Sequence, residues 1–249
     1  MPKHEIDAPE SGFRAAWAGT DLGRFRPSRG TYELYPSESL PPLPEGRFTG
    51  SYDWLGDPGE PVAEHVAAMD QVSAKLAEAN LTLPDDFVAL MTREHLHGAL
   101  DKVSCTCCWT YLAGPFPSPQ DPAARMVMFF RDQQDCVLWY LYLRPAADGS
   151  GTESFVTHSF RNLGYEDELR SAGTEEALQE LKELTEDPYN VISWCAPSTE
   201  QFAYRFWIEG KLWFAASGDT SNNDLTPDMR AYLSHYERAQ EQELAHPGQ

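Results

Sequence analysis

Two apolar runs separated by five polar residues constrain the fold more than any other feature of this sequence. Residues 126–130 are MVMFF, residues 136–143 are CVLWYLYL, and the segment RDQQD lies between them. Aromatic and β-branched residues favour strands, and a short polar break between two such runs is typical of a hairpin loop. These residues therefore predict a β-hairpin.

Further segments of similar composition predict more strands. They are CWTYL (108–112), ESFVTHS (153–159) and NVISWCA (190–196). The segment FAYRFWIEGKLWFAA (202–216) predicts a second hairpin, because Glu209-Gly210 separates two aromatic runs and Gly210 can take the positive φ of a tight turn. We expect these strands to pair in a largely antiparallel sheet.

Four segments have apolar residues at helical spacing. In the segment after Pro61 they are Val62, Val66, Met69, Val72 and Leu76. A short helix is expected within TLPDDFVALM (82–91), where Pro84 and two aspartates suit a first turn. Thr174 is expected to cap a helix that buries Ala177, Leu178, Leu181 and Leu184, and Thr226 one that buries Met229, Tyr232, Leu233 and Tyr236. Hairpins interspersed with helices predict an α+β fold with helices packed on a largely antiparallel mixed sheet.

The first 60 residues differ in composition from the rest. They hold eight of the 19 prolines, together with many aromatic residues, and this mixture favours loops and short extended pieces anchored by rings. The sequence therefore predicts an irregular Pro/Gly-rich N-terminal arm or subdomain over 1–60 and a single α+β domain over 61–245.

The charge of the chain restricts its partners. There are 39 acidic against 19 basic residues, so the net charge is −20. Such a chain repels phosphate backbones, which makes nucleic acid an unsuitable partner. It is suited instead to water, to cations or to a basic protein partner, and acidic proteins occur for other reasons as well.

The expected compartment is the cytoplasm. The sequence has no apolar run of 18 residues, so no membrane association is expected, and its opening residues lack the apolar stretch of a secretory signal. Five cysteines at irregular spacing favour reduced thiols over a disulfide framework.

A cluster of metal-ligand residue types lies before the first central strand. His95, His97, Cys105 and Cys107 could supply four zinc ligands, but the paired C-x-x-C spacing of zinc knuckles is missing. If 104–112 is a strand, Cys105 and Cys107 face one side and Cys108 the other. The interpretation that these cysteines begin a buried strand is therefore favoured over a metal site. No catalytic or cofactor motif is found, so no catalytic residue and no cofactor are expected.

Nine acidic residues gather between Glu166 and Asp187, with only two basic residues among them. One interpretation is a solvated helix face. The other is an acidic surface that meets a basic partner, whose encounter the charge would steer. The candidate partner-binding residues are Glu166, Asp167, Glu168, Glu175 and Glu176.

Three patterns resemble the SUKH superfamily over about residues 60–240. They are LTLPDDFVALM (81–91), FFRDQQDCVLWYLYL (129–143) and FAYRFWIEGKLWFA (202–215). The resemblance implies an α+β fold without catalysis, since many SUKH members are bacterial immunity proteins that block a toxin, often a basic nuclease. It fixes no interface residue in this chain.

Two alternatives come from other functional classes. One is a small enzyme or an accessory protein of a biosynthetic pathway, with a pocket that sequence motifs do not reveal. The other is a regulatory domain that binds a ligand. The lack of catalytic motifs favours a binding protein over an enzyme only slightly.

Overall fold

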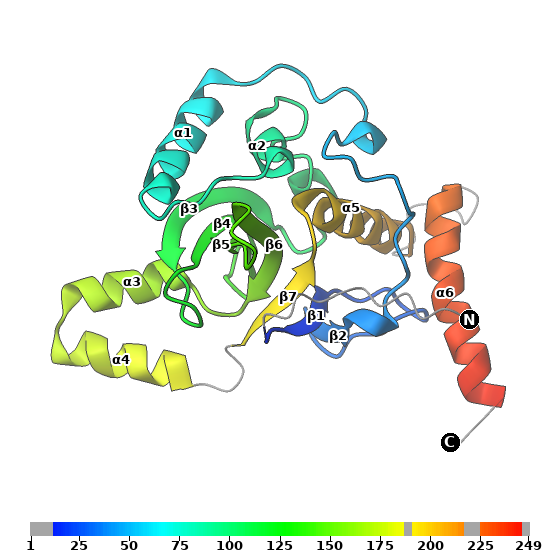
Figure 1. Ribbon diagram of the computed structural model, residues 1–249. Helices are drawn as coiled ribbons and strands as arrows, with labels where there is room; N and C mark the ends of the chain where they lie inside the picture. The colour runs from blue at the N-terminus through cyan, green and yellow to red at the C-terminus, as the bar shows by residue number, and fades with distance from the viewer. Residues whose placement is uncertain (1–11, 187–190, 217–224, 246–249) are drawn as a thin grey trace.

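One seven-stranded sheet organises the chain, and helices pack on it (Figure 1). The computed structural model describes residues 12–186, 191–216 and 225–245. The strand order is β2-β1-β7-β6-β5-β4-β3, and all neighbours are antiparallel except the parallel pair β1–β7. The predicted α+β fold with a largely antiparallel mixed sheet is confirmed.

The elements have the following bounds. The strands are β1 (Arg14–Gly19), β2 (Glu33–Pro36), β3 (Trp109–Pro117), β4 (Arg125–Arg131), β5 (Leu138–Pro145), β6 (Thr152–Ser159) and β7 (Ile192–Ala196). The α-helices are α1 (Ala63–Ala77), α2 (Asp85–Thr92), α3 (Leu163–Ala172), α4 (Glu175–Glu186), α5 (Thr199–Ala216) and α6 (Pro227–Ala245). Within these ranges no helix is both long and apolar enough to cross a membrane.

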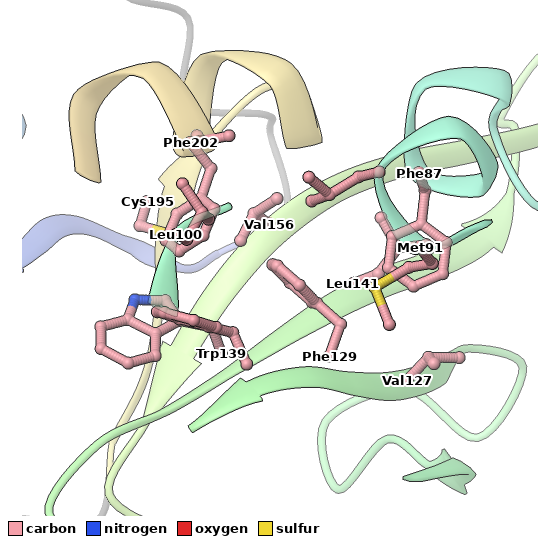
Figure 2. Close-up of a cluster of buried hydrophobic side chains, with 14 of the residues drawn as sticks. Phe87, Met91, Leu100, Val127, Phe129, Trp139, Leu141, Val156, Cys195 and Phe202 are labelled. Atoms are coloured by element: carbon pink, nitrogen blue, oxygen red, sulfur yellow. The ribbon is translucent and has the colours of Figure 1, made fainter. Parts of the chain in front are cut away.

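The hairpin predicted for residues 126–143 is β4–β5, and both of its faces are buried. Successive side chains of a strand point to opposite faces. Val127, Phe129, Trp139 and Leu141 therefore join one core cluster, and Met126, Met128, Tyr140 and Tyr142 join another. Figure 2 shows the first cluster, where Phe87 and Met91 of α2 and Phe202 of α5 pack against these strands. Burial on two sides explains why residues 126–130 and 138–143 are apolar or aromatic throughout.

The second predicted hairpin is wrong, because residues 199–216 form the single helix α5. Phe202 and Ala203 pack into the core under the sheet, whereas Tyr204, Ile208 and Leu212 pack toward α6 in a third cluster. A helix that is buried on two sides is apolar over much of its surface, which gives it the composition of a buried strand.

Glu209 and Gly210 lie inside α5, so they form no turn. A Cβ built on Gly210 would lie 2.1 Å from the carbonyl oxygen of Val103, in the 3₁₀ turn Asp101–Val103. The glycine thus allows close packing of two backbones. Glu209 is buried and bonds Arg26 through both carboxylate oxygens, at 2.7 Å each.

The N-terminal segment is built into the sheet and the helical layer. Strands β1 and β2 pair at one end of the sheet. Arg26 reaches Glu209 on α5, and the Glu200 carboxylate accepts hydrogen bonds from the backbone N–H groups of Gly50 and Tyr52. Buried polar contacts of this kind tie the described part of residues 1–60 to α5.

Candidate functional site

Helices α3 and α4 form a helical hairpin that projects beside β3 (Figure 1). Local capping fixes its shape. The Asn162 side chain accepts hydrogen bonds from the backbone N–H groups of Gly164 and Tyr165, which caps α3. Gly173 ends α3 at a φ of 61°, and the Thr174 hydroxyl then caps α4 by accepting from Ala177. Helix α3 was not expected, whereas the predicted Thr174 cap and helix are confirmed.

The predicted buried stripe of α4 is only partly correct. Ala177 is buried, but the Leu178 side chain is 50% exposed, and Leu181 and Leu184 are half-buried. Glu175, Glu176 and Leu178 line a shallow hollow beside the turn that joins the two helices. The tip of the helical hairpin therefore presents an apolar side chain beside two carboxylates.

Glu166 differs from the other four predicted partner-binding residues. It is only 1% exposed, and its carboxylate accepts hydrogen bonds from Arg161 at 2.7 Å and Arg170 at 2.9 Å. The carboxylate is therefore occupied within the chain. Asp167, Glu168, Glu175 and Glu176 are exposed, so the structure leaves these four accessible.

A polar pocket of about 610 Å³ lies between the helical hairpin and the end of the sheet. Its lining combines aromatic and charged side chains: Tyr111, Phe116, Phe160, Tyr165, Arg131, Asp135, Arg161, Glu166 and Glu168. The volume is within the range of 300–1,000 Å³ that is typical of ligand pockets. Two of the predicted partner-binding residues, Glu166 and Glu168, thus line a pocket together with aromatic and basic side chains that the sequence did not predict to be near them.

The positive charges of the polar pocket are already paired. Arg131 forms an ion pair with Asp135, and its guanidinium lies over the rings of Trp109 and Tyr111, at 5.4 and 4.9 Å from their centroids. Arg161 is held by Glu166. Within the described ranges Glu168 makes no ion pair, so it is the free carboxylate of this pocket.

A signal for part of the pocket exists in the sequence. Arg131 and Asp135 are opposite charges at the two ends of the RDQQD loop, and Arg161 follows the end of β6. Charges that flank a hairpin loop lie at one end of the sheet, where they can meet. The distant aromatic partners, such as Tyr111, carry no such signal.

The predicted metal candidates are held apart. The His95 ring bonds the carbonyl of Asp57 at 3.0 Å, whereas the His97 ring stacks on His65 with centroids 3.8 Å apart. Cys105 contacts Thr20 at 3.7 Å, and Cys107 is exposed. In the part of the chain that the structure describes, no three His, Cys, Asp or Glu residues are placed to hold a metal ion.

The cysteine stretch itself is a turn, so the expectation that a strand begins at Cys105 is wrong. Strand β3 begins at Trp109, and Cys107 has a φ of 57°. The Cys108 N–H donates to Ser104 and helps to close this turn. Burial raises the pKa of the Cys105 and Cys108 thiols, which favours their protonated form.

Comparisons of the chain with protein-family models, curated proteins and solved structures found no match. The resemblance to the SUKH superfamily stays a prediction.

Proposed function

We propose that this chain is a non-enzymatic protein-binding domain that captures a basic protein through its helical hairpin α3–α4 and the adjoining polar pocket. The observation that supports this most directly is the exposed Leu178 among carboxylates at the tip of the helical hairpin. A single exposed leucine is ordinary, but here it adjoins a concentration of one charge sign. Apolar contact and charge complementarity together are what a protein interface uses.

The charge of this segment is a large part of the total. Residues 163–186 hold eight acidic and two basic residues, which gives −6 within a tenth of a chain whose net charge is −20. Surface charges of one sign steer an oppositely charged partner and increase its association rate. The polar pocket offers an anchor point, because Glu168 and the exposed ring of Tyr165 line it together and suit a lysine or arginine side chain.

The resemblance to the SUKH superfamily supports a narrower proposal, namely that the basic partner is a toxin and the chain its immunity protein. A small enzyme or accessory protein of a biosynthetic pathway is the alternative. It is favoured by a second, more apolar cleft of about 420 Å³ beside α5.

Crosslinking tests the proposed surface. A photo-crosslinking residue at position 168 should capture basic proteins that the same residue at position 70, on the exposed side of α1, does not capture. The captured protein is then used for kinetics with a variant that neutralises Asp167, Glu168, Glu175 and Glu176 as Asn or Gln. Glu166 is left intact because it is buried.

A matched control separates local from overall charge. It neutralises Glu60, Glu64, Asp70 and Glu78, which are exposed on or beside α1, so both variants change the net charge from −20 to −16. We expect the hairpin variant to associate about ten times more slowly at low salt, with a flatter salt dependence, and the control to keep most of its rate. Equal rates for the two variants would show that the helical hairpin is only a solvated surface.

A further inference from the structure

A second cleft lies where the segment after β2 meets the beginning of α5. This Arg205 cleft has a volume of about 420 Å³. Leu40, Leu43 and Pro197 supply apolar lining, and Ser37, Gln201 and Arg205 supply polar groups. An apolar cleft of this size with a few convergent polar groups is typical of sites for small organic ligands.

Arg205 is a buried cation whose direct partners are neutral. Arg205 is only 5% exposed. The guanidinium donates to the hydroxyl of Tyr232 at 3.0 Å and to the carbonyl oxygen of Pro41 at 3.1 Å. It forms no ion pair with any residue in the described ranges. A buried guanidinium without an ion pair of its own is costly, so Arg205 is a suitable contact for an anion.

The buried Glu209 carboxylate attracts Arg205, but it is shared with a second arginine. Glu209 is bonded through both oxygens to Arg26, at 2.7 Å each, and it also accepts from Tyr232 at 2.5 Å and Trp17 at 2.8 Å. The buried cluster thus holds two arginines and one glutamate. One positive charge is left over, and it belongs to the arginine that lines the cleft.

The cleft also contains an unsatisfied hydroxyl. Ser37 is 6% exposed, and its Oγ has no hydrogen-bond partner in the part of the chain that the structure describes. Glu45 is the acidic residue among the lining residues, but it is exposed, and solvent screens its charge. The buried polar groups of the cleft, the Arg205 guanidinium and the Ser37 hydroxyl, can both donate a hydrogen bond to a ligand.

We propose that the Arg205 cleft binds a small organic anion, a carboxylate with an apolar body. The carboxylate would lie against the Arg205 guanidinium and the Ser37 hydroxyl, because guanidinium groups match carboxylates in charge and geometry. The apolar body would cover Leu40 and Leu43. This site is separate from the helical hairpin, and its occupant is a small molecule, so the proposal does not depend on the protein partner.

Calorimetry with defined probes tests the proposal. The first probe is 3-phenylpropionate, and its matched control is the neutral amide 3-phenylpropanamide. We expect the acid to bind at least about 10-fold more tightly, because hydrogen bonds to charged groups are stronger than those between neutral groups. Within the series acetate, butyrate and hexanoate, affinity should rise about 4-fold for each methylene group that becomes buried.

Two variants locate the binding while leaving the buried Arg205 intact. Gln201→Glu adds a negative charge to the lining and should weaken the acid about 10-fold without affecting the amide. Leu43→Trp fills the cleft and should abolish binding of both probes.

Three results would overturn the proposal. The first is equal affinity for acid and amide, and the second is binding that Leu43→Trp leaves unchanged. The third is a lack of binding by every acid up to about 10 mM, a concentration that detects millimolar dissociation constants. None of these results bears on the helical hairpin, whose test uses a protein partner.

Discussion

His158 makes the stability of this protein depend on pH between about 6.5 and 4. The side chain lies in β6 and is fully buried. Its Nε2 is 3.2 Å from the carbonyl oxygen of Ala16, so this nitrogen carries the proton, and Nδ1 has no partner among the described residues. Burial lowers the pKa of His158 from its usual value to about 4, because a second proton would place an unpaired charge in the core.

The direction and size of the effect follow from the two pKa values. Below about pH 6.5 the unfolded chain binds a proton on this residue that the folded chain refuses, so the free energy of unfolding falls as the pH falls. With a folded pKa of about 4, the loss at pH 5 is about 2 kcal/mol, and it approaches about 3 kcal/mol at pH 4.

Urea unfolding at about pH 7.5 and pH 5 measures this loss. The variant His158→Gln cannot titrate, so its free energy of unfolding should fall by about 2 kcal/mol less than that of the wild type over this interval. Burial also lowers the pKa of His97 and His235, but both residues are present in both proteins, and their contributions cancel. Parallel pH dependences for the two proteins would refute the role of His158.

Two further contacts are tested by urea unfolding of single-residue variants. Gly210→Ala should lower the free energy of unfolding by about 1–3 kcal/mol, because a Cβ would collide with the Val103 carbonyl. An exposed helical glycine would instead gain about 1 kcal/mol from alanine, so a stabilised variant would contradict the observed packing. Glu166→Gln should cost about 3 kcal/mol by leaving two arginines short of a carboxylate, whereas Glu168→Gln should leave the stability unchanged. Equal stabilities of these two variants would show that Glu166 is not a structural residue.

The sequence predicts an element correctly where the burial of that element produces a recognisable pattern of apolar and polar residues within its own segment. Residues 126–130 and 138–143 of the β4–β5 hairpin are apolar or aromatic throughout because both faces are covered, and a polar loop marks the turn. Helix α5 is also covered on two sides, so its residues are a similar apolar run. No local sequence pattern distinguishes this buried helix from a buried hairpin. Gly210 adds to the similarity, because a glycine that allows close packing has the same sequence signal as a glycine in a turn. The contact that explains Gly210 is with Val103, which lies more than a hundred residues away in the sequence.

The pairing of charged residues is visible in the sequence only where the partners are close along the chain. Glu166 has Arg161 five residues before it and Arg170 four residues after it, so a pairing that removes it from the surface is visible in the sequence. Glu209 has no such signal, because Arg26 is 183 residues away. The pairing of Arg26 with Glu209 also determines what Arg205 can do. A buried arginine four residues before a buried glutamate would ordinarily be its i,i+4 partner, but the glutamate is already occupied. The surplus charge at the cleft is therefore a property of the folded chain that no local pattern could have indicated, and it gives the cleft its expected preference for an anion.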